Sequence, residues 1–265
     1  MQKRIGIAVL FVLLFAVSPG KGATELKEFK KTYPLNSGGE VTLSNVNGRV
    51  EIRSWDKNQV MVKAEIKVKA KSRRDAERYM KHVKIIVDAD LDYVDIETNY
   101  PKKKGSDSFV GWLFGGRKPE VSIKFSLMVP HKTDLEIHTV NGRINVEDVE
   151  GKISLKTTNG AIEATDLRGA VKVNTVNGSV NVDLVEIHED ESLTLSTVNG
   201  SINLNLPSNV RANVNASCVN GHVDTDFPLT ISGKYTGKKI RGEINGGGAR
   251  LYLKTVNGSI NLNER

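Results

Sequence analysis

The chain has 265 residues, a formal net charge of +7 and a single cysteine, Cys218. This length allows one large domain or two modest ones, and a lone cysteine excludes an intrachain disulfide. The charge is uneven, because residues 21–118 carry a balance of +7 and residues 119–265 a balance of −2. Stability must therefore come from burial and hydrogen bonds, and the basic character belongs to the front half.

The first residues have the pattern of a targeting segment. Two basic residues, Lys3 and Arg4, precede a 13-residue apolar run, Ile5–Val17, which is short for a bilayer span. Small residues suited to cleavage follow, as in a secretory signal peptide. We predict that residues 1–22 are a signal peptide and that the mature chain has no transmembrane segment. The protein is then extracytoplasmic, either periplasmic or secreted.

The basic front half raises the question of a charged partner. Phosphate contacts dominate nucleic-acid affinity, but an exported protein meets little nucleic acid, so we expect no such partner. Anionic lipid headgroups or envelope polymers are better candidates for the counter-charge.

Residues 23–130 are predicted to form an N-terminal strand-rich part. Residues 60–68 alternate strictly between apolar and mostly basic side chains, which is typical of a half-buried strand. Ser72 is a plausible cap for a short helix at about 73–82. Further strands are expected at the following residues: 41–52, 83–88, 92–99 and 121–129.

Residues 101–119 have the composition of a loop, with glycines near both ends and basic flanks. The loop nevertheless contains four large apolar residues: Phe109, Trp112, Leu113 and Phe114. Exposed aromatics with basic flanks suit contact with a membrane interface or a partner. The alternative is that these side chains cover one end of the domain, because an open end exposes apolar rows and strand edges.

The clearest signal is the dipeptide Asn-Gly, which occurs eight times, five of them in nearly the same phrase, Thr-Val-Asn-Gly. The glycines from Gly142 to Gly221 are 18, 18, 22 and 21 residues apart, and a period near 20 marks a repeat architecture. We predict repeats over residues 131–265. The predicted structural turns are Asn47, Gly48, Asn141, Gly142, Asn159, Gly160, Asn177, Gly178, Asn199, Gly200, Asn220, Gly221, Asn257 and Gly258.

Two architectures satisfy this pattern. Asn-Gly tolerates the positive φ of two-residue hairpins, which would give an antiparallel meander. Alternatively, Asn-Gly marks the corner of a coil, and coils stack in parallel so that like residues form columns and Asn forms amide ladders. Near-identity between units favours the stack, so we predict a mainly β fold, a right-handed parallel β-solenoid with one short helix. Irregular spacing after Gly221 predicts an insertion in one coil.

The "T-V-N-G-x-I-x-V" units, the strand "SWDKNQVMVKAEI" and the short helix that begins at Ser72 resemble the bacterial putative-adhesin family. This is a domain of unknown function found in exported and envelope-associated proteins, and its members are considered β-helices. The resemblance covers nearly the whole mature chain and implies fold more than function. It supplies no catalytic residues.

Motifs for chemistry are absent from the sequence. The five histidines are scattered, with no zinc-binding spacing, and no hydrolase elbow or phosphate loop is present. Asp148 and Asp166 share a second turn pattern 18 residues apart and could flank Ca²⁺, but Asp is common in turns. We predict no catalytic residue, cofactor or metal.

The predicted function is therefore an adhesin-like binding or scaffolding protein of the bacterial cell envelope that is not an enzyme. Its partner is an unknown envelope component: protein, glycan or anionic lipid surface. Two alternatives stay open, a polysaccharide-active β-helix enzyme and a membrane-surface-associated envelope protein. The enzyme would need clustered carboxylates in one groove.

Overall fold

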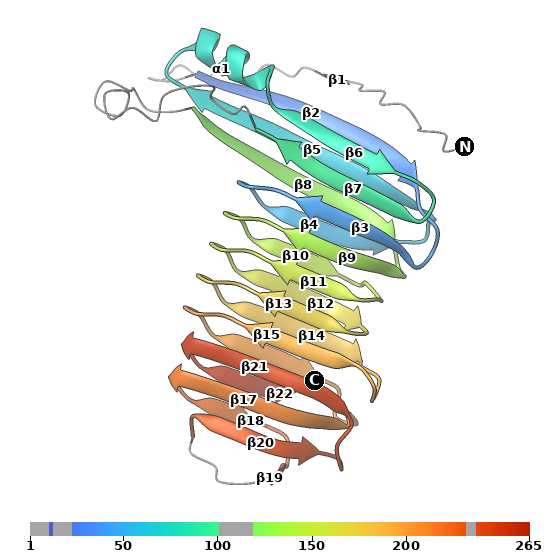
Figure 1. Ribbon diagram of the computed structural model, residues 1–265, viewed down its shortest axis with the longest axis vertical. Coiled ribbons are helices and arrows are strands. Elements are labelled where there is room, and N and C mark those ends of the chain that lie inside the picture. Colours follow the sequence, from blue (N-terminus) through green and yellow to red (C-terminus); the bar gives the residue numbers. More distant parts are fainter. Residues whose placement is uncertain (1–10, 13–22, 101–118, 232–236) are drawn as a thin grey trace.

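The computed structural model describes residues 11–12, 23–100, 119–231 and 237–265. They form a mainly β molecule with one helix, and its two mixed sheets have eleven strands each. Both sheets are open, since their first and last strands are not paired with each other. Figure 1 shows the strands stacked one above another along the long axis of the molecule. The four large apolar residues of the predicted loop, Phe109, Trp112, Leu113 and Phe114, lie outside the described residues.

Sheet A contains, in spatial order, β1 (Phe11–Val12), β2 (Ala23–Pro34), β5 (Gln59–Ala70), β8 (Glu120–Pro130), β4 (Val50–Trp55), β10 (Ile144–Glu147), β12 (Ile162–Arg168), β14 (Val180–Glu186), β16 (Ile202–Leu206), β22 (Ile260–Glu264) and β18 (Val223–Thr225). Sheet B contains β19 (Thr230–Ile231), β20 (Lys239–Ile244), β17 (Ala212–Asn220), β21 (Ala249–Asn257), β15 (Ser192–Ser196), β13 (Val171–Asn174), β11 (Ile153–Lys156), β9 (Thr133–His138), β3 (Gly39–Ser44), β7 (Tyr93–Asn99) and β6 (Lys84–Ala89).

The strands and the helix predicted for the N-terminal part are present. In β5 the alternate residues from Val60 to Ala70 are buried, and the strand pairs antiparallel with both β2 and β8. Helix α1 (Arg73–Met80) begins after Ser72, whose hydroxyl accepts a hydrogen bond from the backbone N–H of Asp75 at 3.1 Å. The helix contacts β2 and β5, so it covers part of that end of the molecule (Figure 1).

Seven of the eight Asn-Gly pairs are corners between the two sheets. In each repeat the strand before Asn-Gly lies in sheet B and the strand after it lies in sheet A, as with β9 and β10. The hairpin alternative is therefore wrong, because a hairpin turn joins neighbouring strands of one sheet. Neighbouring repeats pair in parallel and in register, so that Ile144 stands opposite Ile162 and Ile153 opposite Val171.

The core lies between the sheets and is built from the apolar residues that alternate along each strand. Val171, Val173, Val180, Val182 and Leu184 of one repeat are all at most 2 % exposed. Because every repeat offers apolar residues at the same positions, neighbouring repeats bury columns of mostly β-branched and leucine side chains, which pack well on pleated strands.

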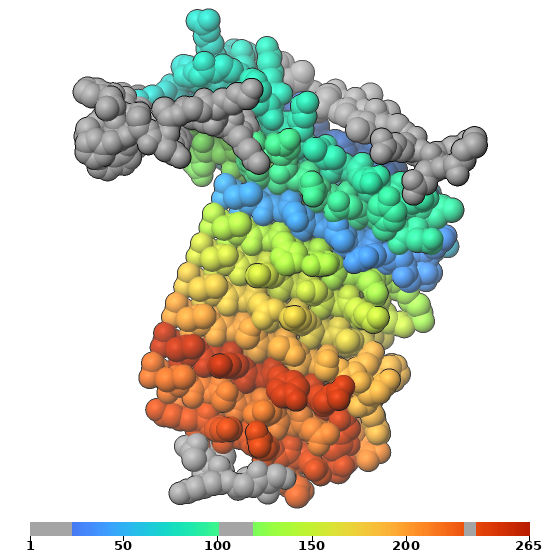
Figure 2. Space-filling model, viewed as in Figure 1, coloured from blue at the N-terminus to red at the C-terminus, as the bar shows by residue number. Residues whose placement is uncertain are grey.

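The order of the coils departs from simple stacking along the chain. The last coil, β21 and β22, lies between the coil of β15 and β16 and the coil of β17 and β18. Figures 1 and 2 show the red band of β21 between two orange bands. The predicted insertion after Gly221 forms β19 and β20, and β20 pairs antiparallel with β17 at that end of sheet B.

The reason for this order of the coils is visible in the sequence. Residues 197–205 and 255–263 are the same nonapeptide, Thr-Val-Asn-Gly-Ser-Ile-Asn-Leu-Asn. The two copies lie directly against each other, with Asn203 opposite Asn261 and Asn205 opposite Asn263. The corner of β17 and β18 carries His222 and Asp224 at positions where those copies have Ser and Asn, so it is a poorer partner for β16.

Candidate functional site

All fourteen residues predicted as structural turns meet at one edge of the molecule. Their asparagine side chains form a ladder in the spatial order 47, 141, 159, 177, 199, 257, 220. Six amide hydrogen bonds of 2.7–2.8 Å connect the seven rungs. Each bond uses one amide as donor and the next as acceptor, which is the arrangement of an Asn ladder in stacked strands.

The glycines of these corners are required by close approach. A Cβ atom on Gly178 would lie 2.0 Å from the carbonyl oxygen of Gly160, and the same contact recurs along the column. Four buried threonine hydroxyls, those of Thr157, Thr175, Thr197 and Thr255, donate to these carbonyls, as from Thr175 to Gly160 at 3.0 Å. Cys218 occupies the threonine position in its corner and is buried. This edge is therefore a structural seam.

A groove of about 590 Å³ crosses β8, β4, β10 and β12 on sheet A, a volume within the range of small-ligand sites. Its half-buried and exposed lining residues are Glu51, Arg53, Ser126, Met128, Asn145, Glu147, Glu163 and Thr165. Two hollows on sheet B are smaller, at about 310 and 260 Å³. The sheet A groove is therefore the better candidate for binding.

The acidic residues of the sheet A groove are ion-paired. Glu147 lies 2.8 Å from Arg53, and Glu163 lies 3.8 Å from Arg143. Glu51 contacts Arg49 at 3.0 Å and also Lys124 at 3.4 Å.

Partial burial acts to raise the pKa of Glu51, but the hydrogen bonds from Arg49 and Lys124 outweigh it and leave the pKa below its ordinary value. A glycosidase needs one carboxyl group with a raised pKa as its general acid. The environment of Glu51 acts in the opposite direction.

A buried oxygen atom in the groove, Oδ1 of Asn145, has no hydrogen-bond partner among the described residues. Asn145 stands opposite Glu51 on one neighbouring strand and opposite Glu163 on the other. Its Oδ1 atom is buried and accepts no hydrogen bond from any residue that the structure describes. An unpaired buried acceptor carries a free-energy cost, so a donor that reached this amide would gain binding free energy.

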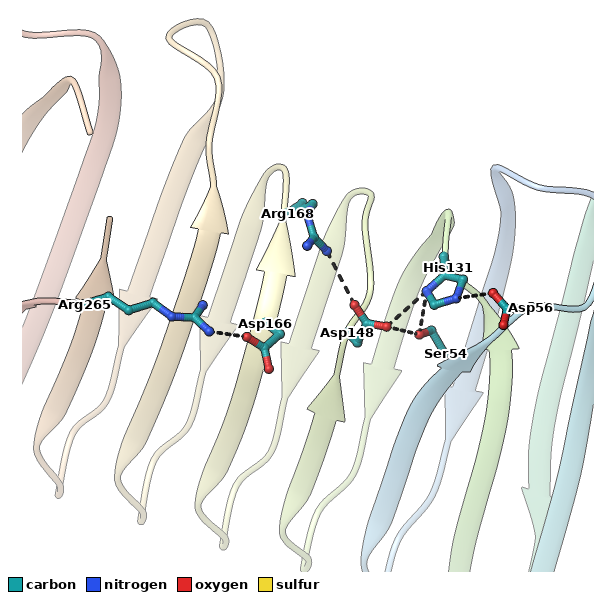
Figure 3. Close-up of polar contacts among 7 residues, drawn as sticks. All are labelled: Ser54, Asp56, His131, Asp148, Asp166, Arg168 and Arg265. Carbon is teal, nitrogen blue, oxygen red and sulfur yellow. Dashed lines mark hydrogen bonds and ion pairs between the residues drawn. The ribbon is translucent and has the colours of Figure 1, made fainter. Parts of the chain in front are cut away.

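The opposite end of the groove, at Arg53 and Glu147, leads to a cluster at the second corner, which is the turn where a coil passes from sheet A back to sheet B. Ser54 donates to Oδ2 of Asp148 at 2.7 Å and also lies 2.8 Å from Nδ1 of His131. Figure 3 shows that the other imidazole nitrogen, Nε2, faces Asp56, at 3.0 Å. The Ser-His-Asp composition suggests nucleophilic catalysis, but each imidazole nitrogen lies beside a carboxylate. The arrangement is better suited to tying β4 to the turns before β9 and after β10.

The second-corner aspartates are satisfied by cationic side chains. Arg168 lies 3.4 Å from Oδ1 of Asp148, and Arg265 pairs with Asp166 (Figure 3). Both aspartates adopt positive φ, 57° and 55°, a conformation that Asp tolerates better than most residues. Within the described ranges, no group of three or more potential ligands could hold a metal ion.

Sequence reasoning missed both the sheet A groove and the Ser54 cluster. Ser54 and His131 are 77 residues apart, and neither belongs to a motif of fixed spacing. The groove depends on which strands are neighbours, and β4 lies beside β8 and β10 although neither is next to it in chain order. A weak signal was present, since Asp148 was noted for its turn position.

A family model described as Toastrack DUF4097 matches residues 34–263. A solved structure described as a putative cell adhesion protein from Clostridium sporogenes is 14 % identical, covers 91 % of this chain and 100 % of its own, and has a TM-score of 0.54.

A second structure, described as a putative adhesin from Bacteroides fragilis, is 10 % identical over 94 % of this chain and 100 % of its own, with a TM-score of 0.37. No curated protein matches significantly. The family match spans nearly the whole chain, as the resemblance in the sequence indicated, and the protein belongs to the Toastrack DUF4097 family.

Proposed function

We propose that this protein is an exported, non-enzymatic β-solenoid that binds or scaffolds a component of the bacterial cell envelope through the sheet A groove. The single observation that carries the proposal is that groove. It gathers acidic, basic and amide side chains from four adjacent strands on one rigid surface. Rigid presentation on strands lowers the entropy lost on binding.

We further propose that the coils wind as a right-handed parallel β-solenoid over residues 131–265, after a signal peptide at 1–22 and a strand-rich part at 23–130. The in-register parallel pairs from β10 to β22 support the parallel arrangement. Connections that return to a parallel strand of the same sheet are right-handed in nearly all proteins, which supports the handedness.

The chemistry of the groove favours a polar polymer with hydroxyl and amino groups, such as an amino-sugar glycan. Its lining has three carboxylates, one guanidinium and one amide, and no aromatic ring. Ion-paired and amide side chains offer hydrogen bonds, whereas stacking against sugar rings uses aromatic faces. Amide ladders continue the surface over β14, β16 and β22, with Asn203 donating to Asn181 and Asn261 to Asn203, both at 2.7 Å.

Export is supported by the N-terminal pattern of Lys3, Arg4 and the apolar run Ile5–Val17. The described part of the chain contains no helix long and apolar enough to cross a membrane. Cell fractionation and N-terminal sequencing of the tagged protein test this step. We expect an extracytoplasmic protein that begins near residue 23, and a full-length cytoplasmic product would contradict export.

The binding proposal is tested by calorimetric titration of the protein lacking residues 1–22 with a soluble amino-sugar oligosaccharide. Glu147→Gln removes a groove carboxylate and the partner of Arg53, so we expect affinity to fall about tenfold, the equivalent of about 1.4 kcal/mol. Glu243→Gln, in the 310 Å³ hollow of sheet B, is the matched control and should bind normally. Equal affinities of both variants would contradict the groove assignment, and no binding at all would reject the glycan.

A membrane-surface role is the second candidate, and β5 is the observation that favours it. Its outer side carries Lys63, Lys67 and Lys69 with Glu65 among them, a mainly basic row that suits anionic lipid. The aromatic residues that would insert are Trp112 and Phe114. Replacing both with Ser should abolish co-sedimentation with anionic liposomes, and unchanged sedimentation would remove this candidate.

A further inference from the structure

The Asn-Gly pairs differ in one chemical property, the freedom of the asparagine side chain to react with the backbone nitrogen of the glycine that follows it. In an Asn-Gly pair the backbone nitrogen of glycine can attack the side-chain carbonyl carbon of asparagine, since glycine has no side chain to hinder the approach. The reaction requires that the asparagine side chain rotates and that the glycine N–H is released. Hydrogen bonds to either group oppose it.

Interior rungs of the ladder hold both reacting groups. Asn177 donates its amide to Asn159 and accepts from Asn199, both at 2.8 Å. The backbone N–H of Gly178 donates to the backbone carbonyl of Asn199 at 3.0 Å. The same backbone bond recurs from Gly48, Gly142, Gly160, Gly200 and Gly258, each to the asparagine of the next rung.

The last rung lacks these restraints. Asn220 donates its amide to Asn257 at 2.8 Å, but within the described residues its Oδ1 accepts no hydrogen bond and the N–H of Gly221 donates none. Gly221 is exposed, whereas the glycines of the other six rungs are half-buried. Both absences follow from the position of Asn220, because no further rung follows it in the described stack.

The first rung and the eighth Asn-Gly pair are held by other groups. At the first rung, Asn47 donates to the carbonyl of Val121 at 3.3 Å and accepts from Asn141 at 2.8 Å. Outside the ladder, Asn245 donates to the carbonyls of Ser208 and Val210 at 3.1 and 2.8 Å. Neither side chain can rotate without breaking these bonds.

We propose that Asn220 is the site at which the folded protein deamidates. The backbone nitrogen of Gly221 forms a bond to Cγ of Asn220, the bond from Cγ to the amide nitrogen breaks, and ammonia leaves. Water then opens the resulting succinimide at either carbonyl, which gives aspartate or isoaspartate. No oxidant and no reactant other than water is needed, and the product places a new carboxylate at the exposed end of the ladder, two residues before His222.

Peptide mapping by mass spectrometry tests the assignment. The protein lacking residues 1–22 is incubated in mildly alkaline buffer, once folded and once in denaturant, and the rate at each of the eight Asn-Gly sites is divided by its rate in the unfolded chain. This ratio cancels sequence effects. Because the other sites must open locally before they react, we expect the ratio at Asn220 to exceed every other ratio by at least about tenfold.

Asn220→Gln supplies the matched variant. Glutamine retains an amide that can donate to Asn257, but it closes a less favourable larger ring, so the acidic species on ion-exchange chromatography should disappear while the fold persists. Equal ratios at all eight sites, a faster reaction at Asn47 or Asn245, or an undiminished acidic species in Asn220→Gln would each overturn the proposal.

Discussion

Asn257 donates its side-chain amide to Asn199 at 2.7 Å although 58 residues separate them. The two asparagines occupy the same position in two copies of one nonapeptide. Between them in the chain lies Asn220, which stacks on the far side of Asn257. Side-chain identity therefore agrees better with the order of the coils than chain order does, and the ladder is continuous because the best-matched segments are neighbours.

Replacing one rung should destabilise the protein according to its position in the ladder. Asn177→Ala removes a donated and an accepted hydrogen bond, so we expect a loss of about 2 kcal/mol in the free energy of unfolding. Asn220→Ala removes only the bond to Asn257 and should cost about 1 kcal/mol. Urea denaturation measures both. Equal costs would contradict a ladder in which the bonds act in series.

The glycine column should be intolerant of any side chain. Gly178→Ala places Cβ 2.0 Å from the backbone oxygen of Gly160, so the coils must separate, and we expect a loss of more than about 3 kcal/mol or failure to fold. Gly38→Ala is the matched control. It has φ of +84° but nothing within 4 Å, so it carries only backbone strain of about 1 kcal/mol. Similar thermal stability for both variants would contradict the steric account.

Replacing a buried threonine with valine should change the free energy of unfolding differently at different corners. Thr175 donates to the carbonyl of Gly160 at 3.0 Å, whereas the hydroxyl of Thr139 is buried without a partner in the described chain. We expect Thr175→Val to lose about 1 kcal/mol of unfolding free energy, while Thr139→Val is neutral or stabilising. Chemical denaturation of the two variants is the test, and a larger loss for Thr139→Val would refute the assigned hydrogen bonds.

The cluster at Ser54 should contribute to stability only above acidic pH. The hydrogen bond from Ser54 is the main cause that lowers the pKa of Asp148, and His131 and Arg168 lower it further. A carboxyl group whose pKa is lowered by folding stabilises the fold above its unfolded pKa of about 3.9. That contribution is lost as pH falls through the folded pKa.

Asp148→Asn removes this charge, so we expect the variant to lose less stability than the wild type as pH falls below about 4. The Asp148 side chain is 42 % exposed, so solvent screening limits the difference to less than about 1 kcal/mol. Denaturant unfolding at a series of pH values measures it. Identical pH profiles of the two proteins would show that the cluster does not stabilise the fold.

The fold was predictable where a signal repeats locally. Alternation around Val60 predicted β5, Ser72 predicted the start of α1, and the Asn-Gly period predicted stacked units, because each pattern depends on neighbouring residues in the chain. The hairpin alternative remained open, since the two sides of an Asn-Gly corner look alike in sequence whether they share a sheet or not. Topology alone separates them.

The binding surface was less predictable because it depends on contacts between distant segments. The groove arises where β4 lies between β8 and β10, and its residues carry no shared motif. The order of the last coils was indicated in the sequence by the repeated nonapeptide that ends at Asn205 and Asn263. Because other corners share the Thr-Val-Asn-Gly part of it, this indication was easily overlooked. A periodic sequence pattern does not show which distant strands pair with each other.

The central claim is that like segments stack directly on one another, with the last coil inserted before the coil of β17. Ser201 and Ser259 are neighbours in that arrangement, with 3.3 Å between the Oγ of Ser201 and the backbone nitrogen of Ser259. Two double-cysteine variants in a Cys218→Ala background test it by oxidation and mass spectrometry. They are Ser201→Cys with Ser259→Cys, and Ser201→Cys with His222→Cys.

Adjacent parallel strands lie about 4.8 Å apart, within disulfide reach, whereas every second strand does not. We therefore expect rapid crosslinking of positions 201 and 259 and none of positions 201 and 222. A disulfide between 201 and 222, without one between 201 and 259, would show stacking in chain order and contradict the account.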